Sequence, residues 1–258
     1  MEELISLKNP KVLLWRSLKD KKAREQHKAF LVEGVRMVRD ALAAGQVPLA
    51  LLLRNGFTPG FPLPEDTPLY VLPEHVFQSV CDTKTPQGIA AVLPLEVRPA
   101  SGPRLLALDG LQDPGNVGTI IRTADAAGFD GVLLSPDCAD LFSPKVLRAT
   151  MGSLFHLGFS FPASLPDALN DLKSRGYSVL SSQLDGTPFF ERENVASSFV
   201  LIIGNEGNGV SLPVREAATH RLALPMQGDA ESLNAAVAAG IMMYDLTRNM
   251  EQVRRKKT

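Results

Sequence analysis

Three stretches of the sequence place glycines and polar side chains directly after a short apolar run. They are 109–122 (DGLQDPGNVGTIIR), 201–211 (LIIGNEGNGVS) and 224–239 (LPMQGDAESLNAAVAA). Runs of this kind are typical of buried strands, and ligands of parallel sheets bind at the carboxyl ends of the strands. We therefore expect the chemistry of this protein to lie in these three loops.

The first loop carries an arginine inside an apolar helix. Arg122 follows Ile120 and Ile121, two turns after Asn116, whose side chain suits a helix N-cap. A guanidinium in such surroundings needs a partner. Two partners are open: Asp125, three residues on along the helix, or a phosphate or reacting oxygen of a ligand.

The second loop is rich in glycine but does not match a phosphate-binding motif. It lacks the lysine and Ser/Thr of GxxxxGK[ST], and it is not GxGxxG, which argues against a dinucleotide-dependent oxidoreductase. Glu206 at its centre would repel a phosphate. Glycines allow a backbone to approach a ligand closely, and Glu206 could hold a cation on a ligand or on Arg122. The alternative is a simple turn with a solvated Glu206.

The third loop precedes a helix rich in alanine. Ser232 either caps this helix or, together with Asn234, faces a ligand. Asn234 is expected in the first helical turn, where an amide is a mediocre helix former. Polar groups at the mouth of such a helix therefore favour a binding site.

The elements that position these loops form two α/β regions separated by a linker at 95–103, which is rich in proline. In the first region strands are expected at 29–33, 49–53, 69–72 and 88–93, and helices at 35–44 and 73–80. In the second, strands begin at 104, 131, 177, 199 and 221, and helices begin near 116, 143, 166 and 211, with a last helix at 232–250. This alternation predicts a parallel sheet covered on both faces.

The composition sets limits on the function. The chain has 258 residues, 45% hydrophobic and 21% charged, with a formal net charge of -1. Cys81 and Cys138 form no CxxC pair and the four histidines are isolated, so no disulfide framework and no metal site is expected. Basic residues cluster at 8–28 and 254–257, where they either meet RNA phosphates or are simply solvated. The N-terminus resembles no targeting signal and no apolar stretch is long enough for a bilayer, so we expect no membrane partner and a cytoplasmic protein.

In their order along the chain, the three loops resemble the motifs of the SpoU/TrmH family, within the SPOUT class of RNA methyltransferases. The residues that carry the resemblance are 116–134, 201–211 and 224–241, and 29–93 resembles the small substrate-binding domain of the family. The resemblance implies an N-terminal extension and small α/β RNA-binding domain at 1–94, the linker at 95–103, and at 104–258 a parallel-sheet catalytic domain with a C-terminal trefoil knot.

The resemblance also implies an activity. Members transfer a methyl group from S-adenosyl-L-methionine to a ribose 2′-OH of RNA, and they act as homodimers with the active site at the subunit interface. Ribosomal RNA, of the large subunit, is the favoured substrate, because the N-terminal domain resembles that of members acting on ribosomal RNA. The alternatives are a tRNA 2′-O-methyltransferase and a non-catalytic RNA-binding protein of the same fold.

Site residues follow by position from the resemblance. The expected catalytic residues are Asn116, Arg122, Glu206, Ser232 and Asn234. The expected cofactor-binding residues are Gly204, Gly209, Leu224, Met226 and Leu233. We expect Arg122 to contact the 2′-OH or the adjoining phosphate, Glu206 to orient Arg122, and Ser232 and Asn234 to position the ribose or the cofactor. After Asn234 the chain has two alanines where many members have serine or valine, a departure outside the expected catalytic set.

Overall fold

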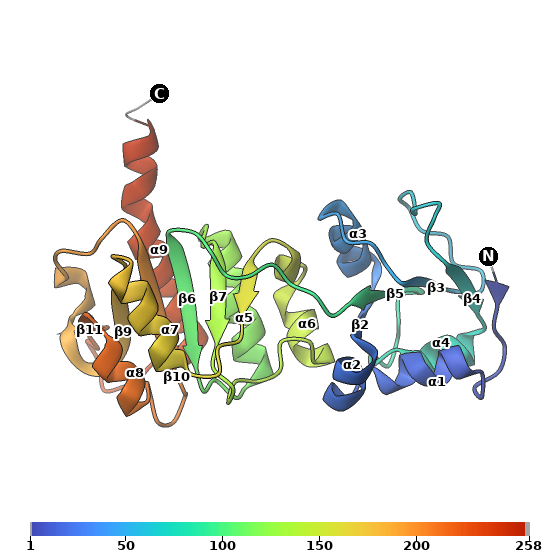
Figure 1. Cartoon of the computed structure of the whole chain (residues 1–258), viewed down its shortest axis with the longest axis horizontal. Helices are drawn as coiled ribbons and strands as arrows, with labels where there is room; N and C mark the ends of the chain where they lie inside the picture. The colour runs from blue at the N-terminus through green and yellow to red at the C-terminus, as the bar shows by residue number, and fades with distance from the viewer. Residues whose placement is uncertain (1, 256–258) are drawn as a thin grey trace. The chain divides into compact units, whose positions relative to one another are not determined.

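The computed structural model describes residues 2–255, and the side chains of 2–248 (Figure 1). The chain folds into two compact units, one formed by Met1–Glu96 with Asp140–Phe155 and the other by Val97–Ala139 with His156–Thr258. Of the basic C-terminal cluster, Lys256 and Lys257 and the side chains of Arg254 and Arg255 lie outside the described residues.

The first unit is built on a five-stranded mixed sheet with the order β1-β4-β3-β5-β2. Its strands are β1 (Glu2–Glu3), β2 (Ala29–Glu33), β3 (Ala50–Arg54), β4 (Leu69–Leu72) and β5 (Ile89–Pro94). Its N-terminal helices are α1 (Pro10–Ser17), α2 (Lys21–His27), α3 (Val35–Ala43) and α4 (Glu74–Val80). The four strands predicted from the sequence and both predicted helices are therefore confirmed within one or two residues.

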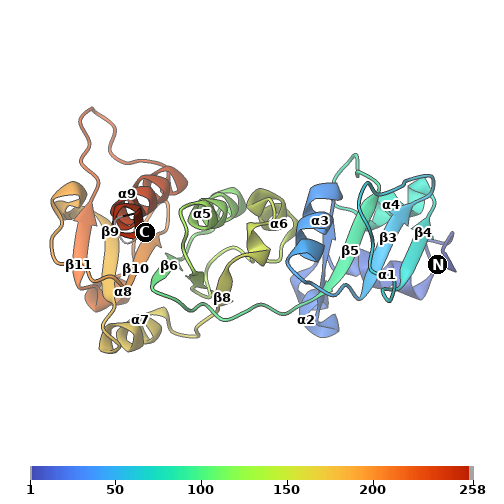
Figure 2. The same ribbon diagram turned by 90° about the horizontal axis from the view of Figure 1, so that it is seen from above.

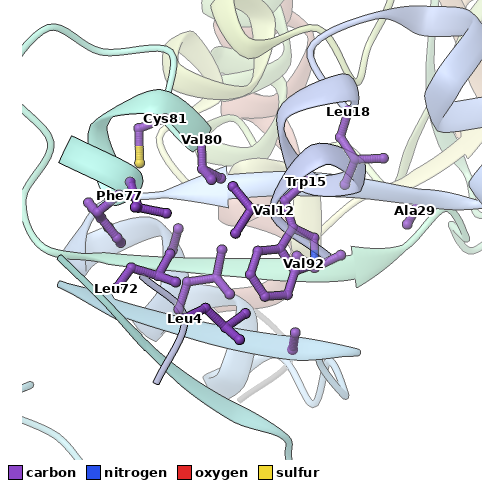
Figure 3. Packing of buried hydrophobic residues seen from close by; sticks show 14 residues of the cluster. Leu4, Val12, Trp15, Leu18, Ala29, Leu72, Phe77, Val80, Cys81 and Val92 are labelled. Carbon is purple, nitrogen blue, oxygen red and sulfur yellow. The ribbon is translucent and has the colours of Figure 1, made fainter. Parts of the chain in front are cut away.

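The core of the first unit lies between one face of this sheet and helices α1 and α4. Figure 3 shows Val12 and Trp15 of α1 close to Phe77 and Val80 of α4, and all four side chains are buried. The Trp15 ring also packs on Tyr70 of β4, with 5.1 Å between the ring centroids. Burial of a large apolar side chain contributes about 1.5–3 kcal/mol, so this cluster is a main source of stability for the unit.

Residues 140–155, which were expected in the catalytic domain, group with the first unit. They contain helix α6 (Pro144–Thr150), capped by Ser143, and the short helix η1 (Ser153–Phe155). Phe142 packs on Phe30 at 4.9 Å between ring centroids, and the buried Arg24 pairs with Asp140. These contacts explain why the segment joins this unit, a long-range arrangement that the linear sequence does not reveal.

The second unit contains a six-stranded sheet in the order β11-β9-β10-β6-β7-β8, and every pairing in it is parallel. Its strands are β6 (Arg104–Asp109), β7 (Gly131–Leu134), β8 (Gly158–Ser160), β9 (Ser178–Pro188), β10 (Phe199–Gly204) and β11 (His220–Ala223). The predicted parallel sheet is confirmed. The prediction missed β8, because a strand of three residues carries too little apolar pattern to recognise.

Helices cover both faces of this sheet, as predicted. They are α5 (Pro114–Ala126), α7 (Leu165–Ser174), α8 (Leu212–Ala217) and α9 (Ala235–Arg255), with the short helix η2 (Phe189–Glu191) after β9. Figure 2 shows α5 and α9 side by side on one face and α7 and α8 on the other. The carboxyl ends of β6, β9 and β10 thus present their loops at the same edge of the sheet.

Candidate active site

The second and third loops and the end of β9 enclose a cavity of about 690 Å³. It is lined by residues 182–185, 203–210 and 231–235, and by Arg215, Leu224, Met226 and Ala238. Small-molecule sites in proteins have volumes of about 300–1,000 Å³, so the cavity is large enough for a cofactor.

The second loop is a closed turn held by its own backbone. Asn205 and Gly209 exchange two backbone hydrogen bonds of 2.9 Å each. A Cβ atom at Gly204 would lie 2.3 Å from the carbonyl carbon of Gly209, so the strand end must be a glycine. Gly209 has a φ of +67°, in the left-handed region that favours glycine. These two glycines therefore shape the wall of the cavity.

Two residues that the sequence did not single out fix this loop against the first. The Asn205 side chain accepts hydrogen bonds from the backbone N–H groups of Gly207 and Asn208, and its amide donates to the carbonyl of Gly110 at 2.7 Å. The buried Asp109 carboxylate, at the end of β6, accepts a 2.7 Å hydrogen bond from the backbone N–H of Ser211. A polar residue ending a buried strand was the available signal for Asp109.

Three of the expected catalytic residues form one directed chain of hydrogen bonds. The Asn234 Oδ1 atom accepts from the backbone N–H groups of Ala236 and Val237, which turns its Nδ2 atom away from α9. That Nδ2 donates to Asn116 Oδ1 at 3.1 Å, and Asn116 Nδ2 donates to Glu206 Oε1 at 2.9 Å. Because each amide donates in the same direction, the chain ends on Glu206 as the acceptor. We call it the amide relay.

Two helix caps considered from the sequence are not the ones that the structure shows. Asn116 does not cap α5: the cap is Asp113, whose carboxylate accepts from the Asn116 backbone N–H at 2.7 Å, and Pro114 occupies the first helical position. Ser232 does not cap the last helix either. That helix begins at Ala235, and Asn234 stands before its first turn as the capping residue.

Arg122 lies apart from the cavity. Its side chain is exposed on α5, and the structure shows no ion pair or hydrogen bond between it and any side chain in residues 2–248. The local partner considered from the sequence, Asp125, instead bonds His156 at 2.8 Å. Glu206, the other expected partner, contacts Asn116 within this chain.

The expected residues are otherwise gathered at the cavity. All five expected cofactor-binding residues line it: Gly204, Gly209, Leu224, Met226 and Leu233. Of the expected catalytic residues, Glu206, Ser232 and Asn234 line it, and Asn116 reaches it through the relay.

The charged side chains of the lining favour a cationic ligand. They include the carboxylates of Asp185, Glu206 and Glu231, and a single base, Arg215. Arg215 is neutralised by Asp185, to which its guanidinium donates at 2.9 and 3.0 Å. S-adenosyl-L-methionine carries a positively charged sulfonium and ammonium. The negative charge of the lining therefore suits this cofactor better than a phosphate.

One wall of the cavity carries an unsatisfied polar atom. Gln183 Nε2 donates to Ser181 Oγ at 2.9 Å, whereas Gln183 Oε1 is buried and has no hydrogen-bond partner among the described residues. Unpaired buried oxygens are uncommon in native proteins. The unpaired oxygen belongs to a residue that lines the cavity. The residue was not identified from the sequence.

Other chemistries find no support among the described residues. No group of three or more His, Cys, Asp or Glu side chains there is arranged to hold a metal ion. Burial raises the pKa of the Cys81 and Cys138 thiols, which disfavours the reactive thiolate of either residue. None of the described helices is both long and apolar enough to span a bilayer.

Comparison with known proteins agrees with this geometry. Residues 103–244 match the model of the SpoU rRNA Methylase family, and residues 9–91 match that of the MRM3-like substrate binding domain. The 23S rRNA (guanosine(2553)-2′-O)-methyltransferase RlmP of Bacillus subtilis is 41% identical over 95% of this chain and 99% of its own length.

Solved structures with the cofactor are similar as well. The AdoMet-bound rRNA methyltransferase from Sinorhizobium meliloti is 31% identical, with a TM-score of 0.84 over 96% of this chain and 97% of that one. The SpoU methyltransferase AviRb from Streptomyces viridochromogenes, in complex with AdoMet, is 26% identical, with a TM-score of 0.81 over 95% of this chain and 100% of that one. The chain therefore belongs to the SpoU rRNA methylase family.

Proposed function

We propose that this protein transfers a methyl group from S-adenosyl-L-methionine to a ribose 2′-OH of 23S rRNA. The observation that carries the proposal is the acid-lined cavity at the carboxyl end of the sheet, bordered by the amide relay. The relative from Bacillus subtilis acts on guanosine 2553 of 23S rRNA, and the corresponding guanosine is the first candidate target. The site of action is then the cytoplasm, where ribosomal RNA is modified.

The cavity would hold the cofactor largely through the backbone. The side chains of Leu224, Met226 and Leu233 offer apolar contact, and Gly204 and Gly209 place bare backbone at the wall. When bound, S-adenosyl-L-methionine supplies a methyl group on a sulfonium, so the protein need not protonate a leaving group. The residues of the chain must then orient the ribose and favour loss of its proton.

The amide relay defines separate roles for the polar residues. Asn234 and Asn116 are positioning residues, because their amides are used to fix Glu206 as an acceptor. One carboxylate oxygen, Oε1, is occupied by Asn116; no bond to Oε2 is seen among the described residues. Glu206 is thereby ready to receive a cationic or hydroxyl donor, and the neighbouring Ser232 would help to position the ribose.

Arg122 would act at the cavity of a second copy of this chain, which requires a homodimer. Its exposed guanidinium has no described partner in the chain, so it is available to a second copy. The adjacent helix α9 exposes an apolar stripe in which Val237, Ile241 and Tyr244 are 51%, 39% and 54% accessible. A stripe with this helical spacing suits packing against the same stripe of a partner.

The role proposed for Arg122 is electrostatic. A guanidinium stays protonated in proteins, so it is a poor base. Placed at the ribose, it would stabilise the negative charge that develops on the 2′ oxygen, or hold the neighbouring phosphate.

We also propose the trefoil knot that family membership implies. The support is that β11 lies at one edge of the sheet, whereas α9, which follows it, packs on α5 and β10 nearer the middle. Between β11 and α9 the chain therefore returns from the edge of the sheet toward its middle. Pulling the unfolded chain from both ends in a force experiment would give a shorter contour length than an unknotted chain of equal length.

The proposed activity is tested by methyl transfer in vitro. The purified protein is incubated with labelled S-adenosyl-L-methionine and, separately, with 23S rRNA and tRNA transcripts. We expect label on a ribose of 23S rRNA. Label on tRNA alone supports the tRNA alternative, and RNA binding without cofactor binding or label supports the non-catalytic one.

A further inference from the structure

The unsatisfied amide of Gln183 lies where two strands of the sheet separate. Strand β9 pairs with β10 only as far as Ser181, which is opposite Ile202. Beyond this point β9 continues as one wall of the cavity, while β10 leads into the second loop. Gln183 is the second residue after the last pair, and it lines the cavity.

The surroundings of Gln183 satisfy only one end of its carboxamide. The nitrogen donates to the Ser181 hydroxyl, and the oxygen is buried and bonds none of the residues that the structure describes. Rotating the amide by half a turn would let the oxygen accept from that hydroxyl, but the nitrogen would then take the unpaired position. One end is therefore unpaired in either orientation. An unpaired buried polar group costs about 1–3 kcal/mol.

We propose that Gln183 is a cofactor-binding residue, whose carbonyl oxygen accepts a hydrogen bond from an N–H or O–H of bound S-adenosyl-L-methionine. The proposal rests on the proposed function. The terminal torsion of a glutamine is soft, so the carboxamide can turn into the cavity that it lines as the cofactor enters. The cofactor supplies the donor that the free chain lacks.

The test compares Gln183→Leu, which removes the amide at similar size, with Gln183→Glu, which keeps an acceptor. Gln78→Leu, at an exposed position of α4 in the first unit, is the matched control. Calorimetric titration measures Kd for S-adenosyl-L-methionine, S-adenosylhomocysteine and methylthioadenosine. We expect about 3- to 10-fold weaker binding in Gln183→Leu, affinity close to native in Gln183→Glu, and no change in the control.

The thermal unfolding of the cofactor-free protein separates binding from structure. Gln183→Leu removes the unpaired oxygen but also the donor to the buried Ser181 hydroxyl, so the two effects on stability oppose each other and its Tm should stay close to that of the native protein. A loss of affinity for all three ligands assigns the bond to the nucleoside half of the cofactor. A loss for S-adenosyl-L-methionine and S-adenosylhomocysteine but not for methylthioadenosine assigns it to the amino-acid half. Either pattern supports the proposal.

Two results would overturn it. One is native affinity of Gln183→Leu for all three ligands; the other is a cofactor complex in which this oxygen bonds water or protein. If the native protein itself binds none of the ligands, the proposed function fails instead.

Discussion

Replacing Asn116 by aspartate tests the amide relay with almost no change in shape. Asn116→Asp keeps an oxygen that can accept from Asn234 Nδ2. It removes the Nδ2 donor, which in the native protein lies 2.9 Å from Glu206 Oε1, and it places a second carboxylate beside Glu206. Loss of a hydrogen bond to a charged group costs about 1.5–3 kcal/mol. Repulsion between charges roughly 4 Å apart adds about 1 kcal/mol in water, the relevant limit for the exposed Glu206.

These terms total roughly 2.5–4 kcal/mol, which corresponds to about a 70- to 1,000-fold loss of kcat/KM if the placement of Glu206 is needed in the transition state. The loss should also depend on pH. Two carboxylates so close together bind one shared proton more readily than an isolated carboxylate does. That proton restores a hydrogen-bond donor between residue 116 and Glu206. The activity of the variant relative to the native protein should therefore rise as the pH falls.

The assay is methyl transfer to 23S rRNA, with kcat/KM measured at several pH values from about 8 down to about 5. Asn208→Asp is the control, because it adds the same charge to the cavity lining, and the Asn208 side chain makes no hydrogen bond to the described residues. Native kcat/KM in Asn116→Asp, or a loss equal to that of the control at every pH, would refute the relay.

Three further substitutions test other parts of the site. Arg122→Ala should lower kcat by about 100- to 1,000-fold without changing the Kd of S-adenosyl-L-methionine, measured by single-turnover kinetics and calorimetry. Gly204→Ala should abolish cofactor binding in calorimetry, because its Cβ would lie 2.3 Å from the returning loop; Gly207→Ala, whose Cβ meets only the Asn205 side chain at 3.6 Å, should bind normally. Tyr244→Glu should dissociate the proposed dimer in light scattering, since it buries a charge in the apolar stripe of α9.

Each of these predictions has an outcome that contradicts it. Near-native turnover in Arg122→Ala would remove the arginine from the reaction. Equal cofactor affinity in Gly204→Ala and Gly207→Ala would show that the second loop tolerates a side chain at Gly204. A native protein that is monomeric at assay concentrations and fully active would exclude the shared site, whatever Tyr244→Glu does.

Much of the fold could be predicted because it depends on local pattern. The strands β6, β7, β9 and β10 are apolar runs followed by glycine or polar residues, and their alternation with helices specifies a parallel sheet. The three motif loops were found for the same reason. Their order along the chain, rather than any single loop, carried the resemblance to the SpoU/TrmH family.

What could not be predicted depends on interactions between distant residues. Asn205 and Gly110 are 95 positions apart, and Asn234 and Asn116 are 118 apart, so neither pairing leaves a local signal. The cap of α5 was misplaced because Pro114 allows the helix to start earlier than Asn116 suggested. Gln183 was missed because an unpaired oxygen is a property of packing and not of spacing.

The central claim is that this chain methylates one ribose of 23S rRNA, and site-by-site mapping of 2′-O-methyl groups tests it most directly. Cellular RNA would be compared with and without the gene, and after complementation by the native and Asn116→Asp proteins. We predict that one 2′-O-methyl group is lost from 23S rRNA, at the guanosine corresponding to 2553, and that only the native protein restores it fully. A 2′-O-methyl map of 23S rRNA that is unchanged without the gene would contradict the claim.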